Sequence, residues 1–204
     1  MRRLFLFTCL VVVVSFQCLV ITAQADKKAE IRQIDKYCKS VNKLFERSNS
    51  AHLVFADVSQ DRKTKWRQFK SEQALENFRE KTETYSIAYN WLKNRKIVRS
   101  NFTLFSESGD WVQYVYHYFR PDGTIARVES ELRTFYGDMT VTQIFYFDGK
   151  GRSLKKTLRY ADLQNKKLVK PNEEFNDSHS DYLKEVNYFK KTTNLPFSHL
   201  LANR

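Results

Sequence analysis

The best candidates for a binding surface come from one aromatic segment of the chain. They are Trp111, Tyr114, Tyr116, His117 and Tyr118, within the run WVQYVYHYF. Aromatic rings supply large apolar contact areas, and a tyrosine hydroxyl usually finds a polar partner when it is buried. These residue types are therefore compatible with a ligand-binding surface that is partly wet. The alternative is that the rings fill the hydrophobic core, which is the commoner role of buried aromatic residues.

Two other groups of residues have types that could do chemistry. Glu129 and Glu131 share one face of a predicted strand, with about 7 Å between their Cα atoms. That separation suits the paired carboxylates of inverting glycoside hydrolysis. The neighbouring Arg127 and Arg133 favour instead a solvent-facing surface of alternating charge. The sequence contains neither a nucleophile elbow nor a phosphate-binding glycine loop, so we favour a non-enzymatic role.

The second group lies in the polar stretch from 177 to 181. Asp177, His179 and Asp181 occupy alternate positions, which would place three possible metal ligands on one side of an extended chain. Polar stretches of this kind also commonly lead into a helix. The chain's four histidines match no metal-binding or nucleophile motif. We therefore predict no metal site and no cofactor.

The first 25 residues have the pattern of a secretory signal peptide. Arg2 and Arg3 precede an apolar run that ends at Ile21, and Ala23-Gln24-Ala25 matches a cleavage site. We predict cleavage after Ala25 and a secreted or periplasmic protein. The alternative is an uncleaved anchor, because the apolar run approaches the roughly 20 residues that span a bilayer.

Removal of residues 1–25 leaves a basic protein of 204 − 25 = 179 residues, a length that fits one domain at 26–204. Its formal charge is (35 − 2) − 23 = +10. A basic exported protein could associate with anionic lipid or an envelope polymer. The charge could equally serve solubility alone. Nucleic acid is not an expected partner, because the chain has no recognisable binding motif.

An amphipathic helix is predicted for residues 26–48. Its apolar positions recur at spacings of three and four, which draws one stripe along a helix. They are Ile31, Ile34, Cys38, Val41 and Phe45. Cys38 is the one cysteine left after cleavage, so no internal disulfide can form. Its place in the stripe favours a buried thiol, although a lone cysteine can also pair between chains or stay reactive.

Residues 85–160 are predicted to form an antiparallel meander of about six strands. Apolar and polar residues alternate there, and the strands are separated by turn sequences at 93–95, 108–110, 120–123, 137–138 and 148–151. Residues 111–119 are apolar on both faces, which predicts a strand covered on both sides. A short strand at 52–58, a short helix at 71–80 and a C-terminal helix at 181–189 complete the prediction.

The expected fold is α+β, with a curved or half-barrel meander packed by the N-terminal helix and a short C-terminal helix. Two functions fit this expectation. The first is an exported, non-enzymatic binding or envelope-associated domain. The second is a carrier of a small apolar ligand or lipid, in which the sheet curls around an aromatic-lined cavity and the helix serves as a lid.

Overall fold

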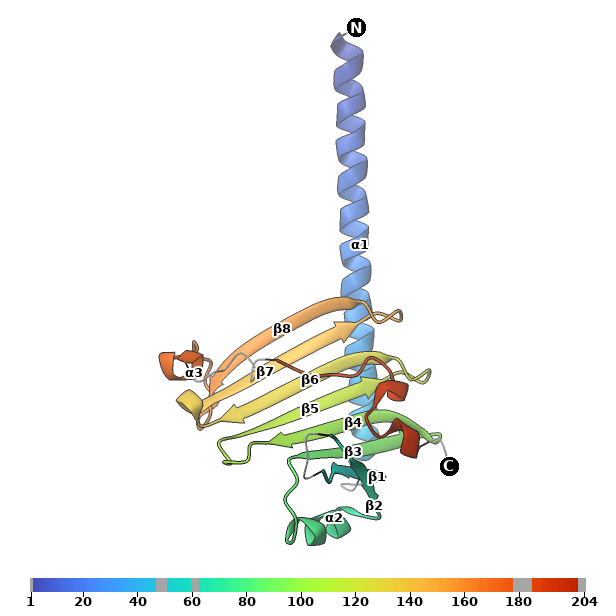
Figure 1. Ribbon diagram of the computed structural model, residues 1–204. Coiled ribbons are helices and arrows are strands. Elements are labelled where there is room, and N and C mark those ends of the chain that lie inside the picture. The colour runs from blue at the N-terminus through green and yellow to red at the C-terminus, as the bar shows by residue number, and fades with distance from the viewer. Residues whose placement is uncertain (1, 47–50, 60–62, 178–184, 202–204) are drawn as a thin grey trace.

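The computed structural model describes residues 2–46, 51–59, 63–177 and 185–201, with side chains from residue 24 onward. The described residues form one open antiparallel sheet of eight strands. A long helix, α1, lies on one face of this sheet, and the C-terminal segment crosses the other face (Figure 1). The predicted α+β class is therefore confirmed.

The eight strands follow one another across the sheet in the order β2-β1-β3-β4-β5-β6-β7-β8. They are β1 (Leu53–Asp57), β2 (Trp66–Phe69), β3 (Ser86–Lys93), β4 (Lys96–Phe105), β5 (Trp111–Phe119), β6 (Ile125–Thr134), β7 (Met139–Phe147) and β8 (Ser153–Asp162). The predicted six-strand meander corresponds to β3 through β8, and the predicted short strand is β1. The additional strand, β2, is too short for its alternation to stand out in the sequence.

The described residues also form three α-helices: α1 (Arg2–Phe45), α2 (Glu72–Arg79) and α3 (Glu173–Asp177). The predicted short helix is α2, whose N-terminus is capped by the Ser71 side chain, which accepts from the Ala74 N–H. Between β5 and β6, Gly123 has a positive φ of 84°, as the predicted turn requires.

The prediction of a C-terminal helix at 181–189 is wrong for the part of this range that the structure describes. Residues 185–189 have no helical structure, and 178–184 lie outside the described residues. The short helix comes earlier, at α3, where Asn172 Oδ1 accepts from the Phe175 N–H. Two single turns of 3-10 helix, η2 (Thr192–Asn194) and η3 (Ser198–Leu200), follow near the C-terminus.

Helix α1 begins at Arg2 and runs through the predicted cleavage site, so cleavage itself stays a prediction. In Figure 1 it continues well past the β8 edge of the sheet. Within the described part of the chain, no helix combines the length and apolarity needed to cross a membrane.

The predicted apolar stripe of α1 packs directly on the sheet. Ile34, Cys38, Val41 and Phe45 are buried in one cluster with residues of β3 to β7, among them Trp91. Cys38 is only 1% exposed, and burial raises the pKa of its thiol to about 12. The buried interpretation of Cys38 is therefore confirmed, and its thiol stays protonated at neutral pH.

The opposite face is covered by the C-terminal segment rather than by a helix. Leu195 and Phe197 are buried there in a cluster with Phe55, Phe102 and Val115. The Phe197 ring stacks on Phe55 with 4.1 Å between ring centroids. Strand β5 is thus covered on both sides, as its two apolar faces predicted.

Two irregularities change the faces that simple alternation predicts. Simple alternation would place Val98 on the same face as Phe102, but the register shifts opposite Trp91 and Leu92, and Val98 packs under α1. A second shift, between Tyr118 and Phe119, places Ala126 on the α1 side as well. Each shift adds one residue to a strand, and one residue is enough to exchange the faces.

Candidate binding site

Strand β5 divides the five predicted binding residues between the two faces of the sheet. Tyr114, Tyr116 and Tyr118 lie on the α1 side, while His117 lies on the side of the C-terminal segment. Trp111, at the first position of the strand, shares the alternation of His117. The structure therefore does not bring the five residues together, because neighbours along a strand point to opposite faces.

His117 is completely buried beneath the C-terminal segment. Its Nε2 accepts from the Phe189 N–H at 3.2 Å, so the proton of the neutral ring is on Nδ1, which lies 3.3 Å from the Val115 carbonyl. Burial lowers the pKa of His117 to about 4. This histidine holds the segment on the sheet and has no surface left for a ligand.

Tyr118 is also a core residue, on the other face. It is 2% exposed beneath α1, and the guanidinium groups of Arg99 and Arg127 lie 6.0 and 4.9 Å from its ring centroid. Cation–π contacts of this kind gain strength when water is excluded. Tyr116, two residues along, is half-buried beside the same cluster, with Arg99 at 4.9 Å.

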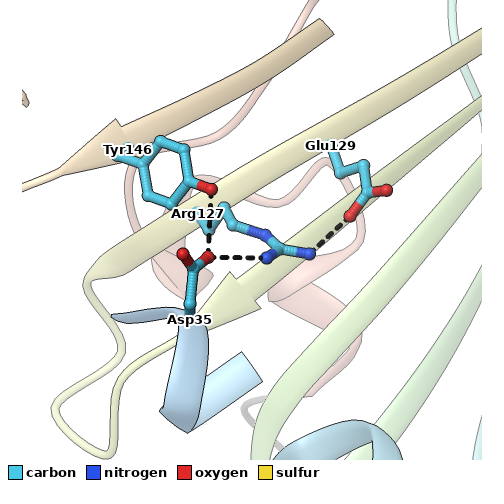
Figure 2. Close-up of polar contacts among 4 residues, drawn as sticks. All are labelled: Asp35, Arg127, Glu129 and Tyr146. Carbon is cyan, nitrogen blue, oxygen red and sulfur yellow. Dashed lines mark hydrogen bonds and ion pairs between the residues drawn. The ribbon is translucent and has the colours of Figure 1, made fainter. Parts of the chain in front are cut away.

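A polar network joins α1 to the sheet (Figure 2). Arg127 of β6 donates to Asp35 of α1 at 3.1 Å and also to Glu129. Asp35 accepts in addition from the Tyr146 hydroxyl at 3.0 Å. Burial, together with this hydrogen bond, raises the pKa of Tyr146 to about 12, so the hydroxyl remains a donor at neutral pH. The network fixes the position of α1 across β6 and β7.

The prediction that the charged residues of β6 form a solvent-facing surface is wrong for Arg127. The Arg127 side chain is only 13% exposed, because α1 covers it. Further along β6 the prediction holds, since Glu131 and Arg133 form an ion pair at 2.6 Å with side chains 35% and 47% exposed. Both glutamates of the proposed hydrolytic pair are thus engaged by arginine.

We expect the substitution Arg127→Met to lower the free energy of unfolding by about 2 kcal/mol. Breaking a buried ion pair costs roughly 3–5 kcal/mol, and the partial exposure of Asp35 and Glu129 reduces that cost. Methionine keeps much of the length of the arginine's aliphatic stem, although it loses the guanidinium that lies over the Tyr118 ring. The measurement is urea-induced unfolding of both proteins.

Arg133→Met is the matched control, because Arg133 also pairs with a glutamate and stacks on a tyrosine, Tyr114, but is exposed. We expect a change within about 0.5 kcal/mol. Equal losses for the two variants would show that the Asp35 contact does not secure α1.

A groove of about 890 Å³ lies at the far end of the sheet from this network, where the β4–β5 and β6–β7 connections meet α2. Phe105, Val112 and Arg133 stand side by side on neighbouring strands in its lining. Its other described lining residues are Glu76, Arg79, Glu80, Glu83, Thr84, Tyr85, Ser106, Glu107, Ser108, Gly109, Asp110, Trp111, Tyr114, Thr134, Phe135 and Leu163. Trp111 and Tyr114 are thus the two predicted residues that reach the groove.

The sequence did not single out the other walls of this groove. Phe135 is 65% exposed at the β6–β7 connection, next to the Gly137 turn that was recognised. A phenylalanine next to a turn is expected to be exposed, and an exposed aromatic residue indicates a candidate binding surface. The contribution of α2 could not be found, because its place beside the β4–β5 connection depends on contacts between distant residues.

No protein-family model matches the chain, and no curated protein or solved structure matches it either. Among the described residues, no group of three or more His, Cys, Asp or Glu side chains could hold a metal ion. Of the polar stretch 177–181, whose residue types could ligate a metal, residues 178–181 lie outside the described residues.

Proposed function

We propose that the protein is an exported, non-enzymatic binding domain whose ligand occupies the groove between α2 and the β4–β5 and β6–β7 connections. The observation that carries this proposal is the groove itself. Its volume of about 890 Å³ lies within the range of about 300–1,000 Å³ common for ligand sites. Five aromatic side chains give it the kind of lining usual for such sites, and its lining also includes seven charged side chains.

The walls of the groove are held together before any ligand arrives. The Phe135 N–H donates to the Asp110 carbonyl at 3.0 Å, and the Tyr136 hydroxyl donates to the Asp110 carboxylate at 3.3 Å. The Ser106 hydroxyl accepts from the Trp111 N–H at 3.1 Å. The two Asp110 bonds join the β4–β5 and β6–β7 connections across the end of the sheet, and the Ser106 bond closes the β4–β5 connection. A preformed site binds more tightly, because less ordering is required on association.

The contact between α1 and the sheet gives the carrier hypothesis less support. In that hypothesis α1 is a lid above an aromatic-lined cavity. Instead, Cys38 and Val41 pack in one buried cluster with Trp91 and Tyr118. The groove offers an open site, and an apolar ligand would be incompletely enclosed there.

Strand β8 supports the further proposal of an anionic lipid or envelope polymer as a partner. It is an edge strand, and Lys155, Lys156 and Arg159 are exposed on it. None of these three takes part in an ion pair among the described residues. Lysines on an edge strand also prevent unwanted pairing with other chains, so this support is weaker than that of the groove.

The substitution Phe135→Ala tests the proposed site. We expect the purified protein to bind at least one of three probes, octanol, a neutral oligosaccharide or a lysine-rich apolar peptide, with shifts of the backbone amide resonances of 105–114 and 133–135. Alanine at 135 should weaken that binding about tenfold, because one large aromatic contact often contributes more than 1 kcal/mol. Protein stability should change by less than about 0.5 kcal/mol.

Leu168→Ala is the control, because Leu168 is 67% exposed, like Phe135 at 65%, but does not line the groove. It should leave the affinity unchanged. Binding that both variants preserve, or no binding of any of the three probes, would contradict the proposed site.

A further inference from the structure

The groove has the opposite charge to the protein as a whole. Its described lining contains five carboxylates and two guanidinium groups, a formal balance of 2 − 5 = −3. The whole chain carries +12, and the predicted mature chain +10. A local reversal of charge in a concave surface concentrates ligands of the opposite sign, here cations.

Four of the five carboxylates have no basic partner among the described ion pairs. They are Glu80, Glu83, Glu107 and Asp110. Glu80, Glu83 and Glu107 are exposed on the rim of the groove. Glu83 accepts from the Tyr85 hydroxyl, while Asp110 helps to hold the two connections together. The three exposed glutamates are therefore free to meet a cation from solution.

The two arginines of the groove show how its walls hold a cationic side chain. Arg79 forms an ion pair with Glu76 at 3.2 Å, and its guanidinium lies 5.0 Å from the Phe105 ring centroid. Arg133 lies 5.3 Å from the Tyr114 ring centroid. Each guanidinium thus pairs with a carboxylate, Glu131 in the case of Arg133, and also lies near an aromatic ring, so electrostatic and cation–π attraction act together.

We infer that the groove binds a partner's peptide segment in which lysine or arginine alternates with apolar residues. This inference rests on the proposed function of the groove and names its ligand. Cationic side chains would meet Glu80, Glu83 and Glu107, while apolar ones would contact Phe135 and Trp111. The groove is open to solvent, so it suits a segment lying along it better than a small ligand, which is normally mostly enclosed.

A second copy of the chain is a less suitable occupant. Two copies each carrying +10 repel one another at long range, and the reversed charge of one groove offsets only part of that repulsion. A partner that offers only a short basic segment avoids bringing a second domain with a charge of +10 close to this one.

The test measures binding of a fluorescently labelled hexapeptide that alternates lysine with leucine and phenylalanine. The triple variant Glu80→Gln, Glu83→Gln, Glu107→Gln should weaken its binding about tenfold at low salt, since each exposed charge contributes at most a few-fold. The difference should shrink as salt is added, because exposed charges are screened. The control Glu173→Gln, Glu174→Gln, Glu185→Gln removes three exposed carboxylates outside the groove and should have no effect.

Each other outcome overturns the inference. The inference is wrong if the groove variant binds the peptide with unchanged affinity. It is also wrong if a peptide with glutamate in place of lysine binds the unmodified protein equally well. Equal binding of spermidine would indicate a small cation, and self-association lost in the groove variant would indicate a second copy. If octanol or the neutral oligosaccharide binds in a Phe135-dependent way and the peptide does not, the inference fails and the proposed function stands. If no probe binds in a Phe135-dependent way, both fail.

Discussion

We expect the substitution Phe197→Ala to lower the free energy of unfolding by about 4 kcal/mol, which is the largest effect expected for any of the substitutions. Truncating a fully buried phenylalanine typically costs about 3–5 kcal/mol, through lost burial and the cavity that remains. Phe197 has no exposed surface, and its ring lies nearly parallel to Phe55, with an interplanar angle of 7°. Trp66 and Phe102 surround it at 5.5 and 5.9 Å between centroids.

The reason for so large an effect is that Phe197 anchors the C-terminal segment to the sheet. Aromatic pairs in contact add about 0.5–1.5 kcal/mol beyond the area they bury. Urea-induced unfolding is the measurement, and a lower midpoint with an unchanged slope would show a change in stability alone. Phe135→Ala makes the same chemical change at an exposed position and should alter stability by less than about 0.5 kcal/mol. A loss below about 1 kcal/mol for Phe197→Ala would show that the segment is not part of the core.

Acidification should cost about 3 kcal/mol of stability between pH 7 and pH 4 through His117 alone. The pKa of His117 is about 4 in the folded protein and about 6.5 when unfolded. Between these values the unfolded chain binds more protons, so stability falls as the pH is lowered. The contribution is fully present above pH 6.5, falls as the pH drops towards 4, and stays constant below that. A difference of roughly 2.5 pH units at 1.36 kcal/mol per unit gives the magnitude.

The physical cause is that a charged imidazole is removed from solvent at this position and meets no carboxylate among the described residues. Protonation of Nε2 would also remove the acceptor of the Phe189 N–H. The Asp122 and Asp148 carboxylates have pKa values below their ordinary value, lowered first of all by hydrogen bonds from Thr124 and Arg152 respectively. Their contributions are therefore lost at more acidic pH than that of His117.

Unfolding in urea at several pH values between 4.5 and 7 measures this loss. His117→Gln retains an acceptor for the Phe189 N–H but cannot titrate, so its stability should be lower at pH 7 and nearly constant over this range. His199→Gln changes an exposed histidine and should keep the pH dependence of the unmodified protein. A His117→Gln variant that loses stability with acid as steeply as the unmodified protein would contradict the assignment.

Local pattern was sufficient to predict most elements of the sheet and the helix that packs on it. The stripe from Ile31 to Phe45 has the spacing of a helix, and burying that stripe requires a flat apolar surface. Alternation with a period of two, interrupted by turn residues such as Gly123, marked the strands of the meander. The two apolar faces of 111–119 indicated that both sides of β5 are covered. Each of these conclusions depends on residues close together in the chain.

Tertiary structure decided which face each aromatic residue occupies and whether that face is open. Val98 and Ala126 changed faces through register shifts that depend on the neighbouring strand. Tyr118 and His117 became core residues because α1 and the C-terminal segment cross the sheet at their positions, while Tyr114 reaches the groove where neither does. Alternation specifies that neighbours point to opposite sides. Only the distant segments that cross the sheet determine which side remains available to a ligand.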